Sequence, residues 1–242
     1  MSGSTTITVP DWAHGRPGVG QGGYSAACFQ AAIGRPVVVS FRAPIPLETP
    51  LAVSPGEGGW MVTHDGTRIM DAEPLERLVE GFATTDPVPI DVAAAGRAAS
   101  EATVADGHDA RSCFSCGLQD TSMKVHAGPL PDGSGRSGTD WLPPPWVGDD
   151  DGVVAAAVVW AVMDCAQGFY VGRRPFPRQA VTGRYAVEMA EPILVGRPYA
   201  VVAHDGHWSG GWDGRKRGAA ASVFAADGTI VARADSLWIA VG

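Results

Sequence analysis

The segment EPILVGRPYAV at residues 191–201 closely repeats the segment APIPLETPLAV at residues 43–53. A shift of 148 positions superimposes identical residues at Pro192, Ile193, Pro198, Ala200 and Val201 of the later segment. The match predicts that the chain contains one fold written twice, and that differences between the copies indicate where the chemistry lies.

A second pair of segments supports the repeat. HDGTRIMDAEPL at residues 64–75 matches ADGTIVARADSL at residues 226–237 with a shift of 162 positions. An Asp-Gly pair flanked by alternating apolar residues is typical of a β-hairpin, so each segment is expected to join two strands. Because the shift grows between the two matches, we expect an insertion in one hairpin of the second copy, around residues 204–218.

Each copy also contains a short apolar run that is expected to form a buried helix. The runs lie at residues 22–34 and 155–168, and each closes on a glycine, which suits the left-handed turn that ends a helix. Segments rich in β-branched residues follow at 35–45 and 181–193 and predict strands. Each copy therefore reads as one helix followed by antiparallel strands.

Further strands are expected ahead of the helices, and these segments are 5–12 in the first copy and 117–130 and 137–146 in the second. The Ala-, Asp- and Gly-rich stretch at 91–112 lies between the copies. We expect the domain boundary there, giving domains at residues 1–105 and 106–242.

Composition excludes several classes of protein. The chain has 242 residues, 45% of them hydrophobic, and a net charge of −8, with one short basic run at 215–217, so a nucleic-acid partner is not expected. The longest apolar stretch, 153–163, is too short to span a bilayer, and the first ten residues lack the pattern of a secretory signal. Four cysteines do not make a disulfide scaffold. We expect a soluble, cytoplasmic protein without a membrane partner.

The sequence resembles the double-hotdog acyl-CoA thioesterases. The segment GVGQGGYSAACFQAA at 18–32 is similar to the Gly-Gly entry into the hotdog helix, and SCFSCG at 112–117 is similar to the Cys-Phe-Val-Cys-Gly opening of small hotdog proteins. VVWAVMDCAQG at 158–168 resembles a hotdog helix with the catalytic acid near its end. The resemblance implies an α+β fold, a tandem hotdog in which a curved antiparallel sheet wraps a long central helix in each copy.

Asp164 is the main catalytic candidate. When the two helical runs are aligned by their closing glycines, Gln30 of the first copy falls opposite Asp164 of the second. A buried carboxylate near a helix C-terminus is expected to have a raised pKa, which suits a general base. The alternative is a structural Asp that caps a neighbouring loop. In the first copy Gln30 stands where the second has the acid. Because its amide cannot accept a proton, a mirror-image site would lack its base, and we expect one working site per chain.

The resemblance implies further site residues. Gly22 and Gly23 at the start of the first helix would provide backbone N–H donors to the oxyanion, although they could equally ease packing. Thr182 matches the family's Thr on the strand after the second helix. The family's Gln on the last strand is replaced here by Ser236, which leaves open a changed mechanism, a changed substrate or loss of activity.

Other residues are expected at the edges of the site. Gln167, close to Asp164, is a candidate for the missing amide, or else a solvated helix end. The acyl chain is expected between the two helices, against Tyr24, Phe29, Trp160 and Met163, unless these are plain core residues.

A metal site is not expected. Cys113 and Cys116 have the spacing of half a zinc site, but a second cysteine pair is missing, and Cys28 and Cys165 read as small core residues of the apolar helices. The proposed chemistry needs no cofactor, because the thioester supplies the electrophile.

We therefore predict an acyl-thioester hydrolase in which Asp164 is the base or nucleophile and the substrate is an acyl-CoA or an acyl-carrier thioester. A non-catalytic protein that binds an acyl chain, an acyl-CoA or a biosynthetic intermediate is the main alternative. A hotdog hydratase would need a His shortly after Asp164, and none occurs. A scaffold protein would lack a cleft at Asp164. Homo-oligomers through sheet edges are compatible with the fold.

Overall fold

The computed structural model describes the chain in five stretches, which are residues 5–77, 81–107, 111–173, 179–208 and 214–241. Within them a single antiparallel sheet contains eleven strands in the order β1-β3-β4-β5-β2-β8-β11-β10-β9-β7-β6. No helix of these stretches is long and apolar enough to cross a membrane.

The first half of the sheet belongs to the first copy of the repeat. Its strands are β1 (Thr5–Ile7), β2 (Val37–Phe41), β3 (Leu51–Gly56), β4 (Gly59–His64) and β5 (Thr67–Pro74), and its helix is α1 (Gly22–Ile33). Short 3-10 turns lie at Asp11–Ala13 and Leu75–Arg77.

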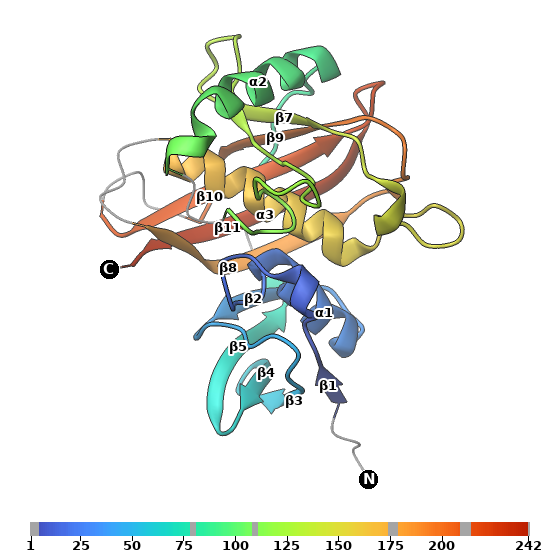
Figure 1. Ribbon diagram of the computed structural model, residues 1–242. Helices are drawn as coiled ribbons and strands as arrows, with labels where there is room; N and C mark the ends of the chain where they lie inside the picture. Colours follow the sequence, from blue (N-terminus) through green and yellow to red (C-terminus); the bar gives the residue numbers. More distant parts are fainter. Residues whose placement is uncertain (1–4, 78–80, 108–110, 174–178, 209–213, 242) are drawn as a thin grey trace.

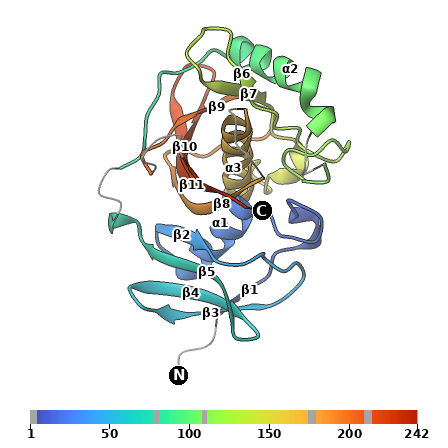
Figure 2. The ribbon, with the colours of Figure 1, turned by 90° about the vertical axis from the view of Figure 1, so that its left-hand side faces the viewer.

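The second half repeats the arrangement on a larger scale. Its strands are β6 (Gly128–Pro129), β7 (Ser137–Trp141), β8 (Ala180–Met189), β9 (Tyr199–Asp205), β10 (Lys216–Phe224) and β11 (Ile230–Ala240). Its central helix is α3 (Ala156–Gly172), preceded by α2 (Ile90–Gly107) and by a 3-10 turn at Pro145–Val147. The strands β8 to β11 curve around α3, which Figure 2 shows from one end.

The two halves meet where β2 pairs with β8. The pairing is antiparallel and places Val39 opposite Tyr185 and Ser40 opposite Arg184. Outward from this junction, β2, β5, β4, β3 and β1 occupy the same places as β8, β11, β10, β9 and β7 (Figure 1). The equivalent strands β3 and β9 begin 148 positions apart, at Leu51 and Tyr199, which is the shift of the first sequence match. The fold is a double hotdog.

The hairpins follow the sequence prediction. Asp65 and Gly66 have positive φ angles of 46° and 76° in the turn between β4 and β5, and Gly228 has a φ of 86° between β10 and β11. The turn between β3 and β4 consists only of residues 57–58, whereas residues 206–215 connect β9 and β10. The predicted insertion in this second hairpin is therefore confirmed, although residues 209–213 lie outside the described stretches.

Helix α1 has the predicted ends. The side chain of Gln21 accepts the backbone N–H of Tyr24 at 2.7 Å and so caps the first turn. The helix ends at Ile33, and Gly34 follows with a φ of 75° and donates its N–H to the carbonyl of Gln30 at 2.9 Å. A glycine in this left-handed conformation satisfies the orphan carbonyl groups of the last turn.

Helix α3 does not end at Gly168, and this part of the prediction was wrong. The helix continues to Gly172, and Gly168 is instead a contact point, because a Cβ there would lie 3.0 Å from the indole of Trp238. Asp164 consequently lies in the middle of the helix, where the dipole of the C-terminus has little effect. Asp164 and Gln30 are still at equivalent positions of the repeat, because the two helices also begin 134 positions apart, at Gly22 and Ala156.

The two helices touch at a glycine. A Cβ on Gly23 would lie 2.5 Å from the carbonyl oxygen of Trp160 and 2.9 Å from the Cβ of Asp164. Side chains of ordinary size at this position would push α1 away from α3. The backbone of α1 is therefore in direct contact with α3 at the level of Asp164, and there is no space for an acyl chain between the helices at this point.

Helix α2 packs on the second copy, which bears on the predicted boundary near residue 105. Its residue Ala93 is in a small core with Ala200, Val202 and Phe224, on the face of β9 opposite to the residues that pack against α3. A boundary between residues 1–105 and 106–242 falls inside this helix. We propose that α2 belongs to the second domain.

We expect Gly23→Ala to lower the free energy of unfolding by about 1–3 kcal/mol, because the added methyl group overpacks the contact between α1 and α3. Chemical denaturation measures the effect. Gly172→Ala is the matched control, since a Cβ at this helical glycine meets nothing within 4 Å. Equal stability of the two variants would contradict a close contact at Gly23.

Candidate active site

A cavity of about 1100 Å³ lies where the two halves meet. Its walls come from the loop before α1, the start of β8, the end of β11, the segment after β2, the inner part of α3 and the turn around Cys113 and Cys116. Asp164 is at this cavity and is almost fully buried, with 4% of its surface exposed.

Three donors hold the carboxylate of Asp164. The side-chain amide of Gln21 donates to Oδ2 at 2.6 Å, and the backbone N–H of Gly23 donates to the same oxygen at 3.2 Å. The hydroxyl of Thr182 donates to Oδ1 at 2.7 Å. Two donors thus come from the first copy and one from β8 of the second, so the site exists only when the halves are joined.

Burial raises the pKa of Asp164 from its usual value of 3.8 to about 6. The hydrogen bonds from Thr182, Gly23 and Gln21 lower the pKa, and the nearby charge of Cys113 raises it. At neutral pH the carboxylate is mostly ionised yet more basic than an exposed Asp, which is the state that a general base requires.

The start of α1 also offers a donor that is not used. Gly22 lines the cavity, and among the residues that the structure describes its backbone N–H has no acceptor. It is one of the first N–H groups of a helix, where the dipole favours negative charge. A Cβ on Gly22 would lie 3.2 Å from Oδ2 of Asp164, so a glycine keeps the approach to this donor open.

Gln21 is the site residue that the sequence analysis missed. It caps α1 through its Oε1 and binds Asp164 through its Nε2, and only 4% of its surface is exposed. The available signal was its position, since Gln directly before a helix is not among the preferred capping residues. An unusual cap beside two glycines indicates that the side chain has another partner.

Ser236 does not line the cavity at Asp164 and its hydroxyl is engaged elsewhere, in contrast to its predicted role. Its hydroxyl donates to the carbonyl of Ala219 at 3.1 Å and accepts the indole N–H of Trp238 at 2.8 Å. The pairing of β11 with β8 shifts register between Leu237 and Trp238. Trp238, and not Ser236, lines the cavity.

Other predicted residues also lie elsewhere. Gln167 is fully buried and donates to the carbonyl of Ala234 at 3.2 Å, so its amide is directed at the sheet. The side chain of Gln30 accepts the backbone N–H of Val37 at 3.0 Å and lines neither of the two large cavities. Three of the expected acyl contacts are core residues outside both cavities, namely Phe29, Trp160 and Met163.

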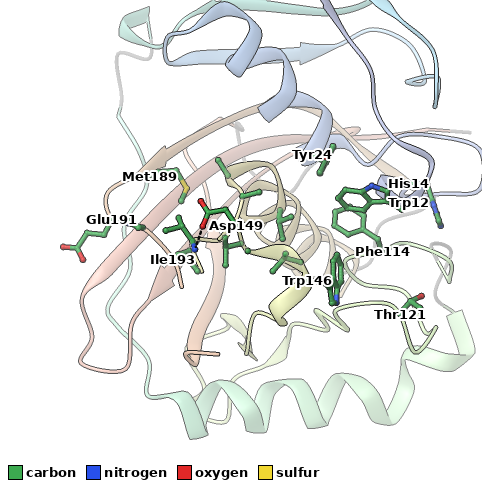
Figure 3. A pocket seen from close by; sticks show the side chains of 18 of the residues that line it. Trp12, His14, Tyr24, Phe114, Thr121, Trp146, Asp149, Met189, Glu191 and Ile193 are labelled. Carbon is green, nitrogen blue, oxygen red and sulfur yellow. Dashed lines mark hydrogen bonds between the residues drawn. The ribbon is translucent and has the colours of Figure 1, made fainter. Parts of the chain in front are cut away.

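Tyr24 lines a second cavity of about 1220 Å³, drawn in Figure 3. Its ring packs edge-on against Trp12 and Phe114, with ring centres 5.2 and 5.8 Å apart, and Trp146 lies 6.2 Å from Trp12. Figure 3 shows these aromatic residues at one end of the cavity and Asp149, Met189 and Ile193 at the other.

The second cavity is the counterpart of the first in the repeat. It is lined by Val154, Ala155 and Ala156, which lie 134 positions after Gly20, Gln21 and Gly22 of the first cavity. It is also lined by residues 189–193, which lie 148 positions after residues 41–45. In the second cavity Ala155 stands at the position of Gln21, and Gln30, the counterpart of Asp164, is not among the lining residues.

Three cysteines also line the cavity at Asp164. They are Cys113, Cys116 and Cys165, and their sulfur atoms lie within 4.8 Å of one another. The interpretation of Cys165 as a plain core residue of its helix is therefore incomplete, because its sulfur joins the Cys113 and Cys116 pair. These three thiols are the cavity's candidate metal ligands.

Comparisons with known proteins give matches by structure only. No protein-family model and no curated protein matches the sequence. A Streptococcus mutans protein solved with bound acetyl-CoA shares 16% identity, and the match covers 45% of this chain and 82% of that one at a TM-score of 0.40. The PaaI protein of the E. coli phenylacetic acid degradation operon shares 11% identity over 45% of this chain and 74% of its own, at a TM-score of 0.39.

An acyl-CoA hydrolase from Staphylococcus aureus, solved with butyryl-CoA and CoA, shares 14% identity. The match covers 45% of this chain and 64% of the hydrolase at a TM-score of 0.39. Each of these matches spans about as much of the chain as one of its two halves.

We expect Thr182→Val to lower the free energy of unfolding by about 1–3 kcal/mol, because it leaves Oδ1 of a buried carboxylate without its donor. The same substitution should cost much less in an Asp164→Ala background, where no carboxylate needs the donor. Denaturant titrations of the four proteins of this double-mutant cycle measure the coupling. Additive effects would show that the two side chains do not interact.

Proposed function

We propose that the protein hydrolyses acyl thioesters and that an acyl-CoA is its substrate. The observation that carries the proposal is the arrangement around Asp164. A buried carboxylate of one copy lies beside a helix N-terminus of the other, in a cavity that is also lined by Gly22, whose backbone N–H is unused among the described residues. A base next to an oxyanion donor is what acyl transfer requires.

In the proposed reaction, the thioester carbonyl oxygen accepts the N–H of Gly22. Asp164 takes a proton from water as the water oxygen bonds to the carbonyl carbon, or its carboxylate attacks that carbon directly. The negative charge that develops on the oxygen is stabilised by the N–H and by the positive end of α1. In the first route the C–S bond then breaks, and the thiolate takes up the proton held by Asp164 and leaves as the free thiol. In the second route C–S cleavage leaves a mixed anhydride on Asp164, which water hydrolyses to the free acid and the restored carboxylate, and a proton from that water goes to the thiolate.

Gln21 and Thr182 position the base in this scheme. Each donates one hydrogen bond to a different oxygen of Asp164, which fixes the plane of the carboxylate. Ser236 has no part in it, because its hydroxyl is engaged with Ala219 and Trp238.

Basic residues at the same cavity suit a substrate with phosphate groups. Arg16, Arg42 and Arg173 all line it, from the loop before α1, the end of β2 and the end of α3. The guanidinium group is well matched to phosphate oxygens, and CoA carries several of these. The volume of about 1100 Å³ is at the upper end of typical small-molecule sites.

Asp164→Asn should lower kcat/KM for acyl-CoA hydrolysis by a factor of about 10²–10⁴, since an amide cannot accept the proton. The measurement is chromatographic quantification of free CoA released from a panel of acyl-CoA esters. Asp149→Asn is the matched control, because Asp149 lines the second cavity and its Oδ1 accepts only backbone N–H groups of its own loop. Wild-type turnover by Asp164→Asn would remove Asp164 from the mechanism.

Arg16→Gln should raise KM for acyl-CoA while leaving kcat/KM unchanged for the corresponding acyl-pantetheine thioester, which lacks the phosphates. The physical reason is the loss of one guanidinium–phosphate contact far from the reacting carbonyl. Steady-state kinetics with both substrates test it. An equal effect on both thioesters would show that Arg16 does not recognise the phosphate groups.

A binding protein without catalysis is the second candidate, and the position of Ser236 favours it. On the last strand, Trp238 and Ile239 line the cavity, and neither side chain can position water as an amide would. This candidate predicts that calorimetry detects acyl-CoA binding while no CoA is released above the buffer rate. The cavity beside Asp164 argues against a purely scaffolding role.

A further inference from the structure

Two distant parts of the chain bring three cysteine sulfurs together. Cys113 and Cys116 lie in a tight turn before β6, and Cys165 lies on α3. The sulfur atoms of Cys113 and Cys165 are 3.9 Å apart, and all three sulfurs are within 4.8 Å of one another. All three residues are buried, whereas Cys28 is on α1 and is not part of the cluster.

The turn that carries Cys113 and Cys116 is closed by a backbone hydrogen bond. The backbone N–H of Gly117 donates to the carbonyl of Cys113 at 2.8 Å, and a Cβ on Gly117 would lie 2.3 Å from that carbonyl oxygen. A side chain at position 117 would therefore not fit this close turn, which fixes the backbone that carries Cys113 and Cys116.

Neighbouring segments fix this turn in place. The hydroxyl of Ser122 donates to the carbonyl of Cys113 at 2.8 Å, and the N–H of Leu118 donates to the carbonyl of Arg111 at 2.9 Å. The hydroxyl of Ser115 also donates to the carbonyl of Ala161 on α3 at 3.4 Å, so the turn is held against α3 independently of any contact between the sulfurs. A ligand set that is already in place lowers the ordering cost of binding an ion.

We propose that Cys113, Cys116 and Cys165 form a binding site for one thiophilic metal ion, Zn²⁺ above all, with its fourth coordination position on the side of the cavity. Zn–S bonds of about 2.3 Å in a tetrahedron place sulfurs about 3.8 Å apart, which matches the separation of Cys113 and Cys165. Because the three sulfurs line the cavity, a water molecule or a ligand in the cavity completes the coordination. The proposal does not depend on thioester hydrolysis, since Asp164 is not one of the metal ligands.

The surroundings suit a cation held by thiolates. The side-chain amide of Gln21 donates to the sulfur of Cys165 at 3.7 Å, which supports its negative charge. Soft sulfur ligands select Zn²⁺ and Cu⁺ over Mg²⁺ and Ca²⁺, which prefer oxygen. Asp164 is next to Cys165 in the sequence, so the ion would lie in the same region of the cavity as the carboxylate.

Cobalt titration of the full-length chain tests the site. The protein is reduced, freed of metal with a chelator and titrated with Co²⁺ without oxygen. We expect near-ultraviolet thiolate-to-cobalt absorption that saturates at one ion per chain and disappears when Zn²⁺ is added. The absence of this absorption, or a disulfide between Cys113 and Cys165 in the reduced protein, would overturn the proposal.

Cysteine variants locate the ligands. Cys113→Ser and Cys165→Ser should each weaken Co²⁺ binding by more than about 100-fold, since the loss of even an outer partner of a ligand costs about 10- to 100-fold. Cys28→Ser is the matched control and should bind as the wild type does. Circular dichroism checks folding, and Cys116→Ala provides a further ligand variant if one of the serine variants is unfolded. Equal loss in Cys28→Ser, or no loss in the folded ligand variants, would sink the assignment.

Discussion

The structure depends on the contact between the carboxylate of Asp164 and the first turn of α1. A carboxylate buried to this degree is costly unless donors replace its water. Gln21 and Gly23 provide such donors from the other copy, and the glycine is needed because the carbonyl of Trp160 lies against it. Joining the two halves and assembling the site are therefore one event. Any change that separates the helices removes the donors and leaves a buried charge.

The same fold carries unlike cavities because the two helices differ in length. Helix α1 ends at Ile33, so Gln30 lies in its last turn and binds the N–H of Val37 at the start of β2. Helix α3 continues to Gly172, so Asp164 lies in mid-helix and faces α1. Gln30, the counterpart of Asp164, does not line the second cavity, and aromatic rings line one end of that cavity.

The sequence predicted what depends on spacing. The repeat and the hairpins follow from positions along the chain, whereas the approach of Asp164 to Gly22 and Gly23 follows from the resemblance to double-hotdog proteins. The prediction from sequence was wrong where tertiary contacts determine which way a side chain points. The strand pairing places Trp238 opposite Thr182 and Ser236 opposite Tyr185, and Trp238 rather than Ser236 lines the cavity. Likewise, the glycine at position 168 reads as a helix end but makes room for that same indole.

Consecutive residues of α3 connect the two parts of the cavity. Neighbours on a helix point about 100° apart, so Asp164 and Cys165 face different partners. The carboxylate faces the first copy, and the sulfur faces the turn that precedes β6 in the second. Buried cysteines pack as small apolar residues, so the fold does not need an ion to be stable. What packing alone does not explain is that two separate segments bring three buried sulfurs within 4.8 Å of one another, and it is this geometry that singles out the cavity wall beside the carboxylate.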